Sequence, residues 1–277
     1  MKNSLFLLLA LLSTTFIFSQ KKDKIKGSKI VTHTIKEIQS FENIEIEDNV
    51  EIYLVKADSA SIEIEADDNL HDVVNFLVVG NTLKVTTLKT VSGAKKFSLR
   101  VNYSAELKLI TVKNDAKLHA LNDLKLENIT IKNFDDSSSF LNVNSTSFTL
   151  ILNDKAKAEV NVKAQNTTLE LSKSAELKAL IASPELKIDL YEKADAKIEG
   201  DAATAKIRLD NSSRLIANKL TIKSMDLTVE NYAKCEVNAV NDIAISASGK
   251  TQIELFGEPK IEMRKFTNTT TLYKKEL

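Results

Sequence analysis

The sequence predicts an all-β protein that folds as a right-handed parallel β-helix, with short coils of about 19 residues and a β-rich N-terminal capping region. Two observations support this prediction. Pairs of apolar residues separated by one residue recur through the second half of the chain, and a second apolar pair follows each of them after a polar corner. A near-constant step of this size is typical of a stacked array, in which each unit buries its apolar face only against its neighbours.

The repeated pairs begin at positions 16 to 21 residues apart and are Ile110/Val112, Ile129/Ile131, Leu150/Leu152, Leu169/Leu171, Ile188/Leu190, Ile207/Leu209, Leu227/Val229 and Ile243/Ile245. The second pairs are Leu118/Ala120, Leu141/Val143, Ala158/Val160, Leu177/Ala179, Ala196/Ile198, Leu215/Ala217, Cys235/Val237 and Ile253/Leu255. The spacing of two residues excludes helical repeats, and a propeller blade needs about twice as many residues per unit. A parallel β-helix fits, because short strands let like residues stack at about 4.8 Å.

The start of the chain predicts a secretory signal peptide at residues 1–19. A basic start precedes an apolar run from Leu5 to Phe18, which is too short to span a bilayer. No second apolar segment of membrane length follows. We predict a flexible leader at residues 20–34, one β-helical domain at residues 35–265, and a C-terminal tail at residues 266–277.

Within the predicted domain, residues 35–106 form the N-terminal part and residues 107–265 the periodic coils. The N-terminal part alternates apolar and polar residues in several short runs, as in Ile44–Glu47 and Ile62–Glu65, which predicts strands with one wet face. A short helical turn is expected at Asp67–Val74, where apolar residues follow at a spacing of three to four.

Composition limits the classes of function. The chain has 277 residues, of which 43% are apolar and 27% charged, so it can bury a core. Lys and Arg together number 38, as do Asp and Glu, so the protein has no global field to attract nucleic acid or anionic membranes. We therefore expect no nucleic-acid partner.

Several segments resemble a known family. They are Ser40–Ile44, Val50–Val55, Ile62–Leu70, Val79–Val85 and Gly249–Ile261, in that order. This set is similar to the head GIN domain family of putative auto-transporter adhesins, and the resemblance covers Ile35 to Glu262. It implies a right-handed β-helix-like fold, a location outside the cytoplasm and no established biochemical activity.

No catalytic, cofactor-binding or metal-binding residue is predicted. The three histidines, His33, His71 and His119, lie far apart in sequence, and His119 is expected to point outward from a strand. Asp67 and Asp68 with Asp72, and Asp135 with Asp136, could bind a cation, but neither cluster has a calcium-loop pattern, so solvated turn carboxylates are favoured. Whether either cluster binds a cation stays open at this point.

The aromatic residues and the single cysteine favour structural roles. The chain has no Trp; Tyr191 and Tyr232 are expected at corners, and Tyr53 and Tyr103 in strands. Cys235 occupies a repeat position held elsewhere by Leu118, Leu141 and Ala158, which predicts a small buried core residue.

The sequence therefore favours an exported, non-enzymatic structural or adhesion-like binding protein of the bacterial cell envelope. Its location would be the periplasm, the outer-membrane surface or the medium. Its partner is unknown; a cell-surface glycan and an envelope protein both fit. The alternatives are a carbohydrate-active β-helix enzyme and a self-assembling envelope scaffold. Such an enzyme would need paired carboxylates and aromatic platforms in a cleft built by long insertions, and the regular period shows none.

Overall fold

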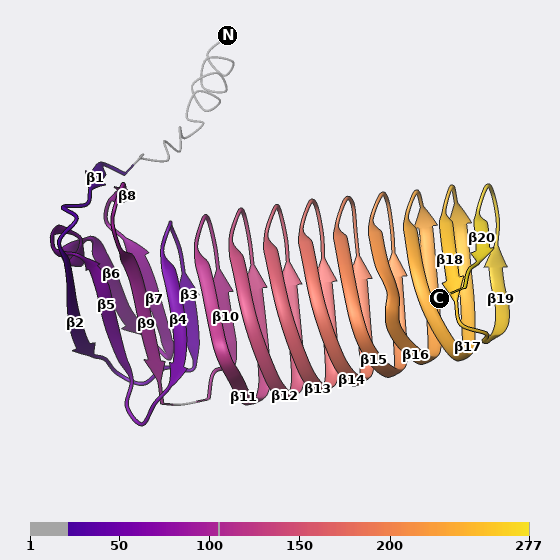
Figure 1. Ribbon diagram of the computed structural model, residues 1–277, viewed down its shortest axis with the longest axis horizontal. Helices are drawn as coiled ribbons and strands as arrows, with labels where there is room; N and C mark the ends of the chain where they lie inside the picture. The colour runs from indigo at the N-terminus through magenta and orange to yellow at the C-terminus, as the bar shows by residue number, and fades with distance from the viewer. Residues whose placement is uncertain (1–21, 105, 277) are drawn as a thin grey trace, which may run out of the picture.

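The computed structural model describes residues 22–104 and 106–276, and it forms an elongated solenoid of about nine turns of stacked parallel strands (Figure 1). Strands make up 71% of the chain and helices 2%, so the predicted all-β parallel β-helix is confirmed. The predicted signal peptide at residues 1–19 lies outside the described residues.

The N-terminal part contains nine strands and one short 3-10 helix: β1 (Lys24–Lys26), β2 (Val31–Glu37), β3 (Asn43–Ile46), β4 (Glu51–Lys56), β5 (Ser61–Asp67), η1 (Asp68–Val73), β6 (Val74–Val79), β7 (Thr82–Thr87), β8 (Thr90–Ser92) and β9 (Phe97–Tyr103). The coils follow as β10 (Leu109–Val112), β11 (Lys117–Asn133), β12 (Ser138–Leu152), β13 (Lys157–Leu171), β14 (Glu176–Leu190), β15 (Asp195–Leu209), β16 (Arg214–Asn231), β17 (Lys234–Gly249), β18 (Gln252–Phe256), β19 (Lys260–Phe266) and β20 (Thr271–Lys274).

Each long strand bends once and supplies both layers of the solenoid. β13, for example, pairs with β12 through residues 157–164 and again through residues 166–171. The bends lie along the lower edge in Figure 1, and tight turns join successive strands along the upper edge. Each coil therefore has two outer faces, one from the first segment of each strand and one from the second.

The tight turns place one residue per coil in the left-handed region. These residues have φ between 58° and 62° and are Asn114, Asp135, Asp154, Lys173, Glu192, Asn211 and Asn231. Asn and Asp tolerate this conformation better than other non-glycine residues. Two positions further on, each turn buries a small side chain, in order Ala116, Ser137, Ala156, Ala175, Ala194, Ser213 and Ala233. This arrangement explains how the chain makes its corners with only six glycines.

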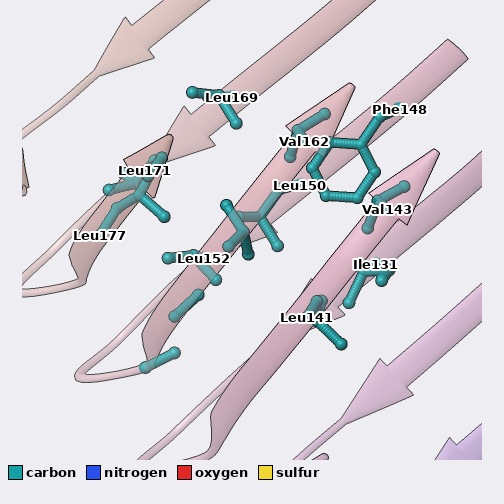
Figure 2. Packing of buried hydrophobic residues seen from close by; sticks show 14 of the residues in the cluster. Ile131, Leu141, Val143, Phe148, Leu150, Leu152, Val162, Leu169, Leu171 and Leu177 are labelled. Atoms are coloured by element: carbon teal, nitrogen blue, oxygen red, sulfur yellow. The ribbon is translucent and has the colours of Figure 1, made fainter. Parts of the chain in front are cut away.

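The core consists of columns of apolar side chains that run along the solenoid. One column, fixed by strand register, is Ile110, Ile131, Leu150, Leu169, Ile188, Ile207, Leu227 and Ile245. Figure 2 shows members of such columns, including Leu150 and Leu169, pointing into the space between the layers. Because these residues are almost fully buried, the interior is a packed core.

The register corrects the sequence alignment in two coils. Ile131 stands beside Ile110 and Ile245 beside Leu227, so the pairs Ile129/Ile131 and Ile243/Ile245 were each placed two residues too early. The partner of Val112 is Asn133, which is buried and bonded to the hydroxyls of Ser137 and Ser139. Polar residues at these core positions hid the repeat.

The N-terminal part forms a cap over the first coil. β3 and β4 make that coil, and β7 and β9 stack on it in parallel. Beyond them the strands become antiparallel: β6 pairs with β7, and β5 pairs with β9 and with β2. The predicted helical turn is present as η1, whose Leu70 and Val73 are buried.

Two terminal segments contain paired strands. The flexible leader expected at residues 20–34 contains β1, which pairs with β8, and the beginning of β2. The tail expected at residues 266–277 contains β20, which pairs with β18. Local pattern missed β1 and β2 because their partners, β8 and β5, lie far away in sequence, whereas β20 pairs with the strand one period before it.

Candidate functional site

Two hollows lie next to each other on the outer face formed by the first segments of the coils. The larger has a volume of about 610 Å³ and is lined by His33, Tyr53, Leu54, Val55, Glu63, Glu65, Lys96, Ser98, Leu99, Arg100, His119 and Asn122. The second has a volume of about 470 Å³ and is lined by Ala120, Phe140, Leu141, Asn142, Glu159, Val160, Asn161, Lys178, Ala179, Leu180, Lys197 and Glu199. They meet where His119 lies opposite Phe140, and together we call them the long groove.

Three stacked rings mark the centre of the long groove. Tyr53 in β4, His119 in β11 and Phe140 in β12 occupy one outward column. The ring centroids of Tyr53 and His119 lie 4.7 Å apart, and those of His119 and Phe140 lie 5.1 Å apart, with nearly parallel planes. Because the rings cover one another, they turn mainly their edges to solvent, and only Phe140, at 36%, is well exposed.

Glu51 lies beside two of these rings. Its Oε1 accepts a hydrogen bond of 3.1 Å from the Tyr53 hydroxyl and lies 3.0 Å from Nε2 of His119. Burial, together with the negative charge of Glu51, raises the pKa of Tyr53. A phenol is protonated at neutral pH, so the Tyr53 hydroxyl donates its hydrogen bond to Glu51 there, and the raised pKa extends this state to higher pH.

The larger hollow contains a network of opposite charges. Glu63 lies 3.5 Å from Nη1 of Arg100 and 3.7 Å from Nε2 of His33, and it accepts a hydrogen bond of 2.8 Å from Asn102. Glu65 lies 3.4 Å from Nζ of Lys96. These contacts join β2, β5 and β9 of the cap to one another.

The second hollow is likewise balanced in charge. Lys178 pairs with Glu159 at 2.9 Å, and Lys197 lies 3.5 Å from Glu199. Asn161 donates a hydrogen bond of 2.8 Å to the side-chain oxygen of Asn142. Leu180 projects among these groups with 53% of its surface exposed.

Asp67, Asp68 and Asp72, the first predicted acidic cluster, have different surroundings in the structure. Asp67 is buried and accepts hydrogen bonds from the backbone N–H groups of Lys29, Lys95 and Lys96. Burial alone would raise the pKa of Asp67, but these N–H groups outweigh it and hold the pKa below its usual range. Asp68 accepts a hydrogen bond from the Ser28 hydroxyl, whereas Asp72 is exposed.

The second acidic cluster lies in the turn between β11 and β12. Asp135 accepts a hydrogen bond from the backbone N–H of Asn114, and Asp154 of the next coil lies 2.5 Å from Nζ of Lys173. Within residues 22–104 and 106–276, no group of three or more His, Cys, Asp or Glu side chains converges as a metal site.

The remaining tyrosines lie where the sequence predicts them, and His71 lies outside the groove. His71 contacts the hydroxyls of Thr32 and Thr34, away from the groove. Tyr191 and Tyr232 lie at corners, where Arg208 covers the Tyr191 ring at 5.9 Å. Tyr103 lies in β9.

Cys235 is free and buried, as predicted, and burial raises the pKa of its thiol. Its column contains Ser139 where the sequence suggested Leu141.

Sequence reasoning missed the groove because its parts come from separate regions. Tyr53 precedes the periodic array, yet β4 pairs directly with β11. A usable signal exists, since Val50-Glu51-Ile52-Tyr53 repeats the in-out order of Ala116-Lys117-Leu118-His119. Two of the three histidines, His33 and His119, line one hollow despite their distance in sequence.

Comparison with known proteins identifies related sequences and structures. A family model described as "Putative auto-transporter adhesin, head GIN domain" matches residues 40–259. No curated protein matches the chain. Among the residues that the structure describes, no helix is both long and apolar enough to cross a membrane.

Three solved structures share the fold. A putative adhesin from Parabacteroides merdae is 18% identical with a TM-score of 0.64, and the match covers 91% of this chain and 99% of that one. A putative adhesin from Parabacteroides distasonis is 20% identical with a TM-score of 0.66, covering 92% and 100%. A putative lipid binding protein from the same species is 16% identical with a TM-score of 0.62, covering 91% and 100%.

Proposed function

The chain belongs to the family described as putative auto-transporter adhesin, head GIN domain, and from this premise we propose that it is an exported, non-catalytic binding protein of the bacterial cell envelope whose long groove holds an extended ligand. The observation that carries the proposal is the groove itself. Its two hollows, of about 610 and 470 Å³, adjoin on one face and combine exposed apolar, amide and charged side chains. Concave sites with a few convergent polar groups are the usual form of a binding site.

Export is supported by the start of the sequence and by the family. A basic start, an apolar run from Leu5 to Phe18 and a polar stretch have the layout of a secretory signal. The family description, putative auto-transporter adhesin, names a class of protein that acts outside the cytoplasm, which agrees with that layout.

A non-catalytic role is supported by the surroundings of the groove carboxylates. A glycosidase needs one carboxyl group that keeps its proton, usually in apolar surroundings. Glu51, Glu63 and Glu65 instead each lie beside a hydroxyl, amide or cationic partner.

The shape of the molecule does not favour lipid as the ligand, although one structural neighbour is named a putative lipid binding protein. An acyl chain needs an apolar cavity, and the solenoid interior is filled by its own side chains. Among the described residues that line the groove, only a few apolar side chains are exposed, chiefly Phe140 and Leu180.

The proposal is tested by binding of the purified protein to whole envelope fractions. Leu180→Glu places a charge in the groove, and Val240→Glu is the matched control, because Val240 is 46% exposed and lies outside both hollows. We expect the wild type and the control to bind and Leu180→Glu to lose binding. Equal binding by all three proteins, or none by the wild type, would overturn the proposal.

End-to-end self-association is the second candidate, because the last coil exposes its inward-facing side chains. Ile261, Met263 and Phe266 are 42%, 45% and 39% exposed. A scaffold would show mass that grows with concentration in light scattering, and Met263→Glu would abolish that growth. A constant monomer mass would exclude this candidate.

A further inference from the structure

We propose that the ligand of the long groove is an uncharged, linear glycan. This inference rests on the proposed function and specifies the chemistry of its ligand. Three features of the groove carry it: the charges are already paired, the exposed amides can both donate and accept hydrogen bonds, and the backbone beneath the second hollow is paired on both sides.

The charged side chains compensate one another. Glu63 lies beside Arg100 and His33, and Glu65 lies beside Lys96. In the second hollow the pairs are Lys178 with Glu159 and Lys197 with Glu199. A charged polymer would meet no excess of opposite charge and would have to displace an existing partner. An uncharged ligand leaves these pairs intact, so charge complementarity favours neutrality.

The polar groups at the surface match hydroxyls. Carboxylates only accept hydrogen bonds and ammonium groups only donate them, whereas a sugar hydroxyl does both. Amides also do both, and Asn122 and Asn161 are exposed side chains that line the two hollows. A sugar hydroxyl can therefore donate to, or accept from, an amide in each hollow.

The backbone argues against an extended peptide. Along the second hollow, β13 and β14 have a paired strand on both sides, as does β12 at Phe140 and Leu141. In the larger hollow the pairing is shorter, because β11 pairs with β4 only from Lys117 to His119 and its register with β12 is interrupted between Ala120 and Leu124. Peptide recognition by strand addition needs a free sheet edge, and the second hollow offers none. A peptide would leave its own N–H and C=O groups dependent on side chains alone.

The apolar contacts suit sugar rings. The edges of Tyr53 and His119, together with Phe140 and the 53%-exposed Leu180, interrupt the polar surface at intervals. Successive strands lie about 4.8 Å apart, so contacts repeat along the groove at a distance comparable to one sugar unit. Each sugar unit of a linear glycan that runs across the strands would therefore contact the outward side chains of one strand.

The test is calorimetric titration of the full chain with hexasaccharides. The uncharged probes are β-1,4-glucan, β-1,3-glucan, xylan, mannan and chitin fragments, and the charged probes are polygalacturonate and heparin fragments. We expect at least one uncharged probe to bind with an affinity that does not change with salt. Leu180→Glu and Tyr53→Ala should each weaken that binding by about tenfold or more, and Val240→Glu should not.

The control for folding is the thermal midpoint of each variant, and loss of binding counts only where that midpoint is preserved. Should Tyr53→Ala not fold, Asn161→Ala replaces it, since Asn161 is exposed. Binding of charged probes alone, or binding unaffected by Leu180→Glu, would overturn the inference. If envelope binding depends on the groove but no uncharged probe binds, the inference fails while the proposed function stands. If envelope binding itself is absent, the proposed function fails.

Discussion

The two ends of the solenoid finish the same core in different ways. At the N-terminal end the chain turns antiparallel and covers the first coil, which buries Phe41, Leu70, Val73 and Val74, whereas Ile35 in β2 and Leu77 and Val79 in β6 stay exposed on the cap itself. At the C-terminal end, β19 pairs only with β17 and β20 only with β18 among the described residues. The columns of the core end there in exposed side chains.

The open end has features that discourage strand pairing. β19 carries a register irregularity between its pairings with Ile245 and Ser246, and Arg264 and Lys265 lie at that point. Arg264 also reaches back to Asp226 at 2.9 Å. Bulges and cationic side chains on an edge strand oppose addition of a further strand. The difference teaches that one end is closed by packing and the other is protected by charge and shape.

The largest effect on stability is expected at Ile245, which we compare with Met263, the next side chain in the same core column. Ile245 is fully buried, whereas Met263, its neighbour in the last coil, is 45% exposed. Ile245→Ala should lower the free energy of unfolding by about 2–5 kcal/mol, the usual cost of a buried cavity. Met263→Ala should cost less than about 1 kcal/mol, since little burial is lost. Urea unfolding measures both, and equal losses would show that the last coil is covered in solution.

An intermediate effect concerns the anchor of the cap. Because the folded pKa of Asp67 is depressed, its carboxylate stabilises the cap above the pKa of the unfolded chain, about 3.9. That stabilisation is lost as the pH falls through the lower folded value. Asp67→Asn should therefore weaken the cap at neutral pH and remove this part of its acid sensitivity.

Amide exchange of Lys29, Lys95 and Lys96, followed from neutral pH to pH near 3, measures the effect. Asp72→Asn is the control, because Asp72 is exposed on the adjacent helix η1. Unchanged protection of the three amides in Asp67→Asn would contradict the assigned role.

The smallest effect is expected at the tight turns, whose backbone conformation is similar near both ends of the solenoid. Asp48 near the cap and Asn268 in the last coil both have positive φ, at 71° and 64°. Glu192 holds the same conformation with a less suitable side chain, at φ 59°. Glu192→Asn should raise stability by about 0.5 kcal/mol by relieving that strain. Lys193→Asn, one residue later, should have no such effect, and thermal unfolding of both variants distinguishes them.

The sequence predicted the coils well because period is a local property. Columns such as Leu150, Leu169 and Ile188 repeat at a fixed step and need no knowledge of distant partners. The alignment failed where Asn133 and Ser139 replace apolar residues. These buried side chains hydrogen-bond within their own cluster, and in the sequence they cannot be told from the polar residues of an exposed segment.

The cap and the groove could not be predicted in the same way. β1 and β2 are strands only because β8 and β5 lie beside them. The groove requires β4 to adjoin β11 although β5 to β10 intervene in the chain. Patterns along the chain indicate which residues face outward, but strand order decides which outward residues meet.

The uninterrupted register from β12 to β15 has a consequence for how such molecules change in size. Lys157 pairs with Glu176 one turn later, so deletion of residues 157–175 would bring Glu176 into the place of Lys157 with every column still aligned. Each turn gained or lost by duplication or excision alters the reach of the molecule by about 4.8 Å. Evolution can thus lengthen or shorten the surface that meets a partner in whole-turn increments, while both termini keep their structures.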